Sequence, residues 1–385
     1  MLFLYGLLLT SSFILVHCET KSSPKLELVA IFNHQVTGVS VHPTSSRIFV
    51  SFPRWAEDST VSVAEVFSKD TIGPYPPHSN WNSWRNAQKD KLDSSKYFVC
   101  VQSIVVFEDS LYVLDPAAPA FGPIIKGGPK LVEIDLTTNQ TKRTILFDED
   151  VAPQGSYLND VRFSPDGTYA YITDSGATGA IVVVDLKTEK AWRVLHGHPS
   201  TQRDTTVIVK YNGQPLHQID GRGVEFSADG IALSIDGSTL YWQAIQGKTL
   251  YSIPTSHLHS CDSNKQLSAR VAIVGENGPA DGLWISRKQP NLLYVSSIQD
   301  DSIRVRDLQK NTYEVLLTDK RLSWPDTFSE DEQGYIYVTA SHIPASAMFN
   351  KQASKQLRTD LWKFKPSINM EETKNAQSRK EEETL

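Results

Sequence analysis

The segment DGIALSIDGSTLYW, residues 229–242, has the pattern of a β-hairpin. Ile231 and Leu233 fall on one face of its first strand, because successive side chains of a strand point to opposite faces. Asp236-Gly237 then supplies a tight turn, and the apolar run at 240–242 forms the return strand. The segment therefore predicts two adjacent antiparallel strands.

Five other segments repeat this pattern, at intervals of about 45–70 residues along the chain. Repetition of a hairpin at long period is typical of a β-propeller, in which each unit buries its apolar faces against its neighbours and the ring closes. The six units predict an all-β fold, a six-bladed β-propeller over residues 25–365. The other copies are TGVSVHPTSSRIFV (37–50), QSIVVFEDSLYV (102–113), NDVRFSPDGTYAYI (159–172), DGLWISRKQPNLLYV (281–295) and DTFSEDEQGYIYV (326–338).

Each copy begins with a polar residue. Because the first strand of a propeller blade lines the central channel, these residues should meet around one channel mouth and form a candidate ligand-binding site. An Asp at the start of such a strand can instead close the blade turn by accepting backbone hydrogen bonds, so both roles stay open for the three Asp. The six residues are Thr37, Gln102, Asn159, Asp229, Asp281 and Asp326.

Charge and motifs exclude several classes of function. The formal net charge is −6 and the basic residues are scattered, which argues against a nucleic-acid partner and favours a small-molecule ligand. The sequence has no G-x-S-x-G, H-E-x-x-H or C-x-x-C motif and no Gly-rich phosphate loop. Hydrolase, zinc-protease, redox and nucleotide-binding functions therefore have no motif to support them.

Both chain ends differ from the repeats. The apolar run LFLYGLLLTSSFILV, residues 2–16, predicts a signal peptide at 1–18, cut near Cys18, and hence a secreted, extracellular protein. A membrane anchor is the alternative, but the run is short for a span, so no membrane association is expected after cleavage. The charged segment 366–385 lacks apolar periodicity and predicts a disordered tail.

Cleavage leaves Cys100 and Cys261, which could form one disulfide in a secreted chain. Their positions in different blades favour buried free thiols instead. The sequon Asn139-Gln140-Thr141 falls between two predicted strands, at an exposed hairpin tip. It predicts N-glycosylation of Asn139 in a eukaryotic host.

Two segments, 67–97 and 196–222, lack strand alternation and predict long loops that shape the mouth of the channel. Four tryptophans lie in or near mouth-lining segments, where an indole face could stack on an aromatic amine. Trp324 is the preferred stacking residue because it directly precedes Pro325-Asp326, and packing between blades is the alternative role. The other three are Trp55, Trp81 and Trp84.

Several short segments together resemble the yellow / major royal jelly protein family. The resemblance covers roughly residues 30–365 and implies a secreted six-bladed propeller. Some members of that family are similar to dopachrome-converting enzymes, and others bind biogenic amines in the channel. The segments are FPRW (52–55), GPYPPHSNW (73–81), Leu-Asp-Pro (114–116), NDVRFSPDGTYAYITDSG (159–176), ADGIALS (228–234) and WPDTF (324–328).

A more distant resemblance, to gluconolactonase/regucalcin-type propellers, implies a divalent cation in the channel. The matching positions are Thr37, Asn159, Asp229 and Asp281. Here Thr37 replaces the family's Glu and Asp229 replaces an Asn, so Asn159, Asp229 and Asp281 are weak candidates for holding Ca²⁺ or Mg²⁺. We expect no tight metal binding, because Thr37 supplies no charge.

These observations favour a binding protein. Three Asp at the channel mouth, with no Lys or Arg at the matching positions, predict a negative potential that prefers an aromatic amine to a neutral aromatic of the same shape. The alternative is an enzyme of the same fold, a dopachrome-type tautomerase or a metal-dependent lactonase, with a carboxylate as general base.

Overall fold

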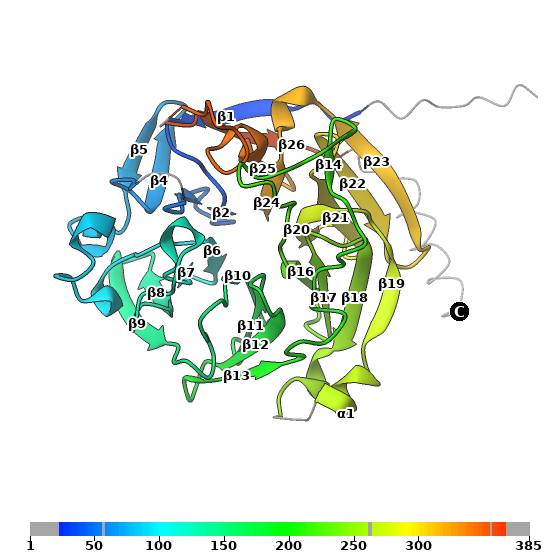
Figure 1. Ribbon diagram of the computed structural model, residues 1–385, viewed down its shortest axis with the longest axis horizontal. Helices are drawn as coiled ribbons and strands as arrows, with labels where there is room; N and C mark the ends of the chain where they lie inside the picture. The colour runs from blue at the N-terminus through cyan, green and yellow to red at the C-terminus, as the bar shows by residue number, and fades with distance from the viewer. Residues whose placement is uncertain (1–22, 56–57, 261–263, 355, 367–385) are drawn as a thin grey trace, which may run out of the picture.

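The computed structural model describes residues 23–55, 58–260, 264–354 and 356–366. This part of the chain forms a six-bladed β-propeller, in which six four-stranded sheets surround a central axis (Figure 1). The all-β, six-bladed fold is therefore confirmed. The predicted signal peptide, and all of the predicted tail except Pro366, lie outside the described residues.

Each repeated segment forms the two inner strands of one blade. The innermost strands, in blade order, are β2 (Val39–Val41), β6 (Ser103–Phe107), β10 (Leu158–Phe163), β16 (Ala228–Leu233), β20 (Ala280–Ile285) and β24 (Pro325–Glu330). The second strands are β3 (Ile48–Ser51), β7 (Ser110–Asp115), β11 (Tyr169–Asp174), β17 (Thr239–Ala244), β21 (Leu292–Ser297) and β25 (Ile336–Ala340).

Two further strands complete each sheet on the outside. The third strands are β4 (Val63–Ser68), β8 (Lys130–Asp135), β12 (Ala180–Asp185), β18 (Thr249–Pro254), β22 (Ser302–Asp307) and β26 (Thr359–Phe364). The outermost strands are β5 (Thr71–Pro74), β9 (Gln140–Leu146), β13 (Lys190–Val194), β19 (Ala272–Glu276), β23 (Thr312–Thr318) and β1 (Glu27–Phe32).

The remaining elements are short and lie in the connections. They are the hairpin β14 (Lys210–Tyr211) and β15 (Gln214–Pro215), the helix α1 (Asn264–Ser268), and the 3₁₀ helices η1 (Trp81–Ser83), η2 (Asn86–Gln88), η3 (Ser94–Lys96), η4 (Pro119–Phe121), η5 (Thr255–His257), η6 (Lys320–Leu322) and η7 (Ile343–Ala345). Among the described residues there is no helix with the length and apolar character needed to span a bilayer.

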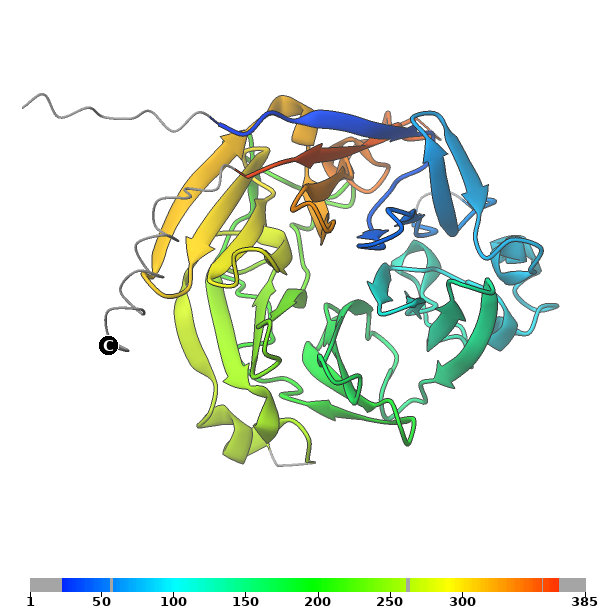
Figure 2. The ribbon, with the colours of Figure 1, turned by 180° about the vertical axis from the view of Figure 1, so that it is seen from behind.

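The N-terminal strand closes the ring. β1 pairs antiparallel with β26, so a strand from the start of the chain completes the sheet whose other three strands come from its end (Figure 2). Glu27 pairs with Lys363, and Phe32 pairs with Thr359. Backbone hydrogen bonds thus join the first and last parts of the propeller. The repeat did not reveal this exchange, because a single strand carries no repeat signal.

Apolar side chains of facing sheets fill the space between the blades. Between the second and third blades, Leu114 and Leu131 pack with Val161 and Ile172, and each of the four is at most 1% exposed. Full burial of such a side chain stabilises the fold by about 1.5–3 kcal/mol relative to leaving it in water. The alternating pattern of each repeat is therefore the pattern of these interfaces.

Two glycines allow neighbouring inner strands to approach closely. A Cβ added at Gly230 would lie 2.1 Å from the carbonyl oxygen of Asp281, and one added at Gly282 would lie 1.9 Å from that of Asp326. The partner atoms belong to the backbone of the next blade, which cannot move without opening the ring. The Asp-Gly pair at the start of two repeats is thus explained by packing around the axis.

We expect Gly282→Ala to lower the free energy of unfolding by about 1–3 kcal/mol or more, since overpacking at this contact forces the inner strands apart. Gly223→Ala is the control, because a Cβ there has no heavy atom within 4 Å. Urea unfolding of both variants measures the difference. Equal stability of the two variants would show that the inner strands adjust freely.

The segment 67–97 differs from its prediction as a loop. It includes the end of β4 and the whole of β5, which pairs with β4. It lies at the outer edge of the first two blades (Figure 1). The strand was missed because its sequence, TIGP, contains Gly, which weakens a strand, and Pro, which is largely confined to edge strands.

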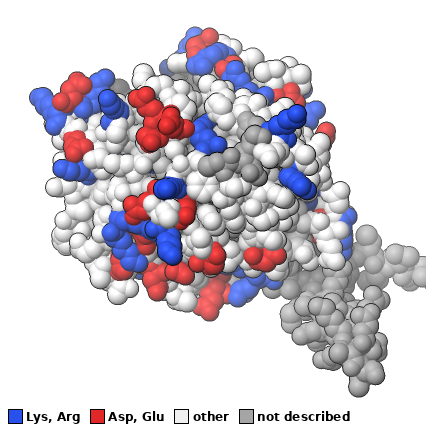
Figure 3. Space-filling model, turned by 90° about the horizontal axis from the view of Figure 1, so that it is seen from below, with Lys and Arg blue, Asp and Glu red and all other residues white. Residues whose placement is uncertain are grey.

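Surface charge is mixed in sign. On the face seen in Figure 3, Lys and Arg side chains alternate with Asp and Glu over the outer parts of the molecule. No broad stripe of one sign is visible on that face.

Candidate functional site

The starting residues of the repeats meet at one end of the channel. Five of them line a small cavity of about 30 Å³, which has room for one or two water molecules. We call this cavity the acid chamber; its five repeat residues are Gln102, Asn159, Asp229, Asp281 and Asp326. Thr37 does not line it; its hydroxyl lies 3.4 Å from the carbonyl oxygen of Gln102.

Side chains of the acid chamber are hydrogen-bonded to one another and to nearby groups. Asn159 Nδ2 donates to Asp229 Oδ2 at 2.6 Å. The indole of Trp324 donates to Asp281 Oδ2 at 2.7 Å, and Ser341 Oγ donates to Asp326 Oδ2 at 2.7 Å. The three Asp therefore bond mainly to side chains, unlike the backbone-capping Asp that was the alternative interpretation.

Burial changes the charge of this chamber. It raises the pKa of Asp229 and of Asp326 well above the ordinary value, and the Asp281 carboxyl raises both further. Burial also raises the pKa of Asp281, to about 6, against the hydrogen bond from Trp324, which lowers it. As the pH rises, Asp281 is thus the first of the three carboxyls to lose its proton. The chamber carries less negative charge than three free carboxylates would.

This raised pKa predicts a pH-dependent stability difference. The folded protein holds the Asp281 proton more tightly than the unfolded chain, so this contribution to stability is full below about pH 4 and is lost as the pH rises through about 6. Asp281→Asn removes that loss. We expect the stability of the variant, relative to the wild type, to increase by about 2 kcal/mol between pH 4 and pH 8.

Urea unfolding at both pH values tests this expectation. Asp166→Asn is the matched control, because hydrogen bonding by Ser164 lowers the pKa of Asp166 to about 2, so its contribution to stability is lost only below about pH 4 and the control should change little between pH 4 and pH 8. If the stability difference between Asp281→Asn and the wild type is the same at pH 4 and pH 8, Asp281 ionises normally in the folded protein.

The acid chamber does not fit a divalent cation as it is arranged. Within the described residues, no group of three or more His, Cys, Asp or Glu side chains is placed to hold a metal ion. The amide of Asn159 turns its Nδ2 toward Asp229, and Asp281 Oδ2 already accepts the indole hydrogen bond. These groups satisfy one another and do not present a set of oxygen ligands.

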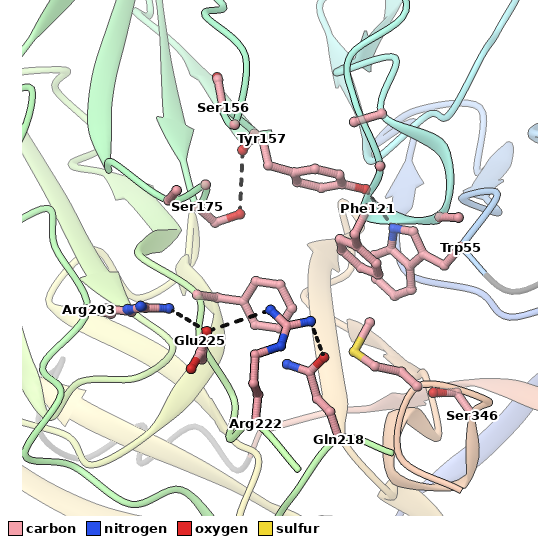
Figure 4. Close-up of a pocket in the computed structure, with 18 of the residues that line it drawn as sticks. Trp55, Phe121, Ser156, Tyr157, Ser175, Arg203, Gln218, Arg222, Glu225 and Ser346 are labelled. Carbon is pink, nitrogen blue, oxygen red and sulfur yellow. Dashed lines mark hydrogen bonds and ion pairs between the residues drawn. The ribbon is translucent and has the colours of Figure 1, made fainter. Parts of the chain in front are cut away.

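A much larger pocket, of about 560 Å³, lies next to the acid chamber (Figure 4). We call it the mouth pocket. It falls in the size range of small-molecule sites, about 300–1,000 Å³. The two cavities share six lining residues, which form a layer between them: Trp55, Phe121, Tyr157, Ser175, Phe226 and Met348.

The aromatic members of this layer contact one another. The ring centroid of Phe121 lies 5.0 Å from that of Trp55, 5.3 Å from that of Tyr157 and 5.7 Å from that of Phe226. Trp55 Nε1 donates to the Tyr157 hydroxyl at 2.6 Å, and this hydroxyl donates to Gln102 Oε1 at 3.1 Å. Tyr157 thus connects the mouth pocket with the acid chamber.

The loop that carries Phe121 has an unusual backbone. Ala117, Ala120 and Phe121 have φ angles of 54°, 55° and 51°, in the left-handed region that non-glycine residues rarely adopt. Each such residue costs of order 1–3 kcal/mol and persists where the surroundings impose it, often at ligand sites. Phe121 was not among the residues predicted from the sequence. A large apolar residue among Ala, Pro and Gly in the loop 117–122 was the available signal.

The opposite wall of the mouth pocket is charged (Figure 4). Arg203 Nη1 donates to Glu225 Oε2 at 2.8 Å, and Arg222 Nη1 lies 3.7 Å from the same oxygen. Arg222 also pairs with Asp220 at 2.8 Å. Arg203 and Arg222 belong to the segment 196–222, so this segment does line the mouth as predicted. The segment 67–97 contributes no lining residue.

The tryptophans occupy different environments. Trp324 is only 1% exposed, has a φ of 53° and bonds to Asp281; it lines the acid chamber and not the mouth pocket, and its stacking role stays a prediction. Trp81 stacks on Phe98, and Trp84 is fully buried. Trp55 alone among the four lines the mouth pocket.

The predicted glycosylation site and Cys100 lie among the described residues. Asn139 lies in the turn between β8 and β9, and its Oδ1 accepts hydrogen bonds from Arg47 and from the Tyr75 hydroxyl, at 3.1 and 3.0 Å. Asn139 is partly exposed, and glycosylation of its Nδ2 stays a prediction. Cys100 is a buried free thiol, whereas Cys261 lies outside the described residues.

Comparisons with known proteins agree with this architecture. A model of the major royal jelly protein family matches residues 101–372, more than half of the chain. Comparison with curated protein sequences found no significant match.

Among solved structures, a luciferin-regenerating enzyme is similar with a TM-score of 0.53 and 11% identity, over 90% of this chain and 96% of that one. A streptogramin B lyase is similar with a TM-score of 0.51 and 10% identity, over 90% of this chain and 98% of that one. At such identities the likeness shows the fold alone.

Proposed function

Because the chain belongs to the major royal jelly protein family, we propose that it is a secreted binding protein that holds a small aromatic amine in the mouth pocket. Secretion is inferred from the apolar segment at residues 2–16. Ligand binding is inferred from the pocket itself. No nucleic acid, membrane or metal cofactor enters the proposal.

The observation that carries the proposal is the aromatic layer beneath a pocket of about 560 Å³. Trp55, Phe121 and Phe226 are each only partly buried, so their rings remain accessible to a flat ligand. Aromatic faces also attract a cation, by about 0.5–2 kcal/mol for each favourable contact. Glu225 in the wall, and Asp281 below the layer, add negative charge on the same side of the propeller.

Calorimetric titration with tryptamine and with 3-ethylindole tests this function, because the two share the ring and differ in the amine. We expect tryptamine to bind about five- to tenfold more tightly, consistent with one partly exposed charged contact. Absence of binding by both compounds would contradict an aromatic site. Equal affinity would contradict the role of the amine.

A second candidate is a proton-transfer enzyme, and the observation that favours it is the pKa of about 6 for Asp281, near the value suited to a general base. The acid chamber, at about 30 Å³, has no room for a substrate unless the aromatic layer opens. Conversion of an aminochrome, followed by absorbance, tests this candidate. Turnover that is lost in Asp281→Asn would support it, and absence of turnover in the wild type would exclude a dopachrome-type reaction.

A further inference from the structure

The charged wall of the mouth pocket has hydrogen-bonding capacity that the protein does not use. Both arginine contacts to Glu225 go to one oxygen, Oε2. Within the described residues, no hydrogen bond or ion pair reaches the other oxygen, Oε1. An acceptor that is partly buried and unpaired can take a hydrogen bond from a ligand ammonium.

The two guanidinium groups also have unused donors. Of the nitrogens of Arg203, only Nη1 donates to a described residue. Nε and Nη2 of Arg222 both lie 2.8 Å from Asp220 Oδ2, and Nη2 also donates to Gln218, whereas Nη1 has only the 3.7 Å contact with Glu225. Among the described residues, Nη1 of Arg222, and Nε and Nη2 of Arg203, are thus free to donate charge-assisted hydrogen bonds to a ligand carboxylate.

We propose that the mouth pocket selects zwitterionic aromatic ligands, of the aromatic α-amino acid class, over the corresponding amines. This inference rests on the proposed function and specifies its ligand. The aromatic ring lies on the layer of Trp55 and Phe121, the ammonium contacts Glu225, and the carboxylate contacts Arg222 with Arg203.

Charge balance explains why a zwitterion suits this wall better than an amine. In the described part of the chain, Glu225 is the only carboxylate that lines the mouth pocket, and Arg203 and Arg222 line it too. Asp220, which pairs with Arg222, does not line the pocket. An ammonium alone would approach Glu225 beside the guanidinium groups of Arg203 and Arg222, and Asp220, which pairs with Arg222 at 2.8 Å, offsets only part of that positive charge. A carboxylate next to that ammonium offsets this repulsion, because each ligand charge then meets one of opposite sign.

Four indole compounds separate the two ligand charges: tryptophan, tryptamine, indole-3-propionate and 3-ethylindole. By calorimetry we expect tryptophan to bind about tenfold more tightly than tryptamine, as for one charge-assisted contact at a partly exposed site. Arg222→Gln should remove this preference and leave the affinity for tryptamine unchanged or higher. Arg222 is 59% exposed, so the substitution should not disturb the fold.

Arg321→Gln is the matched control. Arg321 is 54% exposed and pairs with Asp319 two residues before it, as Arg222 pairs with Asp220, but it does not line the mouth pocket. The control should keep the preference for tryptophan.

Each outcome distinguishes this inference from the proposed function. Tryptamine that binds as tightly as tryptophan, or more tightly, overturns the inference and leaves the amine function intact. Indole-3-propionate that binds as tightly as tryptophan supports the carboxylate contact and contradicts the role of the amine. Absence of binding by all four compounds overturns both.

Discussion

Asp115→Ala should lower the free energy of unfolding by about 3–5 kcal/mol, because it leaves the ammonium group of Lys130 buried without its counter-ion. Both side chains are 0% exposed, and Lys130 Nζ lies 2.9 Å from Asp115 Oδ2. The carboxylate also accepts hydrogen bonds from the backbone N–H groups of Val99 and Cys100, at 2.6 and 2.9 Å. Burial lowers the pKa of Lys130 and Asp115 raises it, so the variant lysine should lose its proton more readily.

Urea unfolding followed by tryptophan fluorescence measures this loss. Asp93→Ala is the control, since Asp93 pairs with Lys96 on the surface, where the two side chains are 54% and 76% exposed, and should leave stability nearly unchanged. The double variant Asp115→Leu with Lys130→Met should recover part of the loss, because it removes both charges together but leaves the backbone N–H groups of Val99 and Cys100 without their acceptor. A loss in Asp115→Ala as small as in the control would show that the pair is not buried in solution.

Trp55→Ala should weaken binding of an aromatic ligand about 30-fold or more, corresponding to ~2 kcal/mol, as for a central aromatic contact. Trp55 lines both cavities, packs on Phe121 and donates to the Tyr157 hydroxyl. The substitution therefore removes a stacking face and loosens the layer at the same time. Titration with tryptamine and tryptophan measures the effect.

Two variants sharpen this comparison. Trp81→Ala removes the same type of side chain from a stack with Phe98, away from the mouth pocket, and should leave affinity unchanged. Trp55→Phe keeps a ring face but loses the indole hydrogen bond, and should give an intermediate affinity. Unchanged affinity in Trp55→Ala would place the ligand outside the mouth pocket.

The sequence by itself was sufficient for the six blades and for the residues that meet at the axis. Strand alternation and turn residues act over about a dozen neighbouring positions, so each hairpin can be read locally. Once the hairpins are arranged in a ring, their starting residues must lie near one another. Gln102, Asn159, Asp229, Asp281 and Asp326 were predictable on this basis, whereas Thr37, which was also predicted, does not line the chamber.

The mouth pocket, the pairing of the closing strand and the charge state of the acid chamber could be known only from the tertiary structure. Trp55, Phe121, Phe226 and Met348 come from separate loops, and these loops are held by long-range contacts such as the backbone bond from Ile219 to Met348 at 2.9 Å. No local pattern marks such contacts. The pKa of Asp281 likewise depends on burial and on Trp324, which lies 43 positions away in the chain. Loop position and protonation are properties of the packed whole, because both depend on neighbours that only folding brings together.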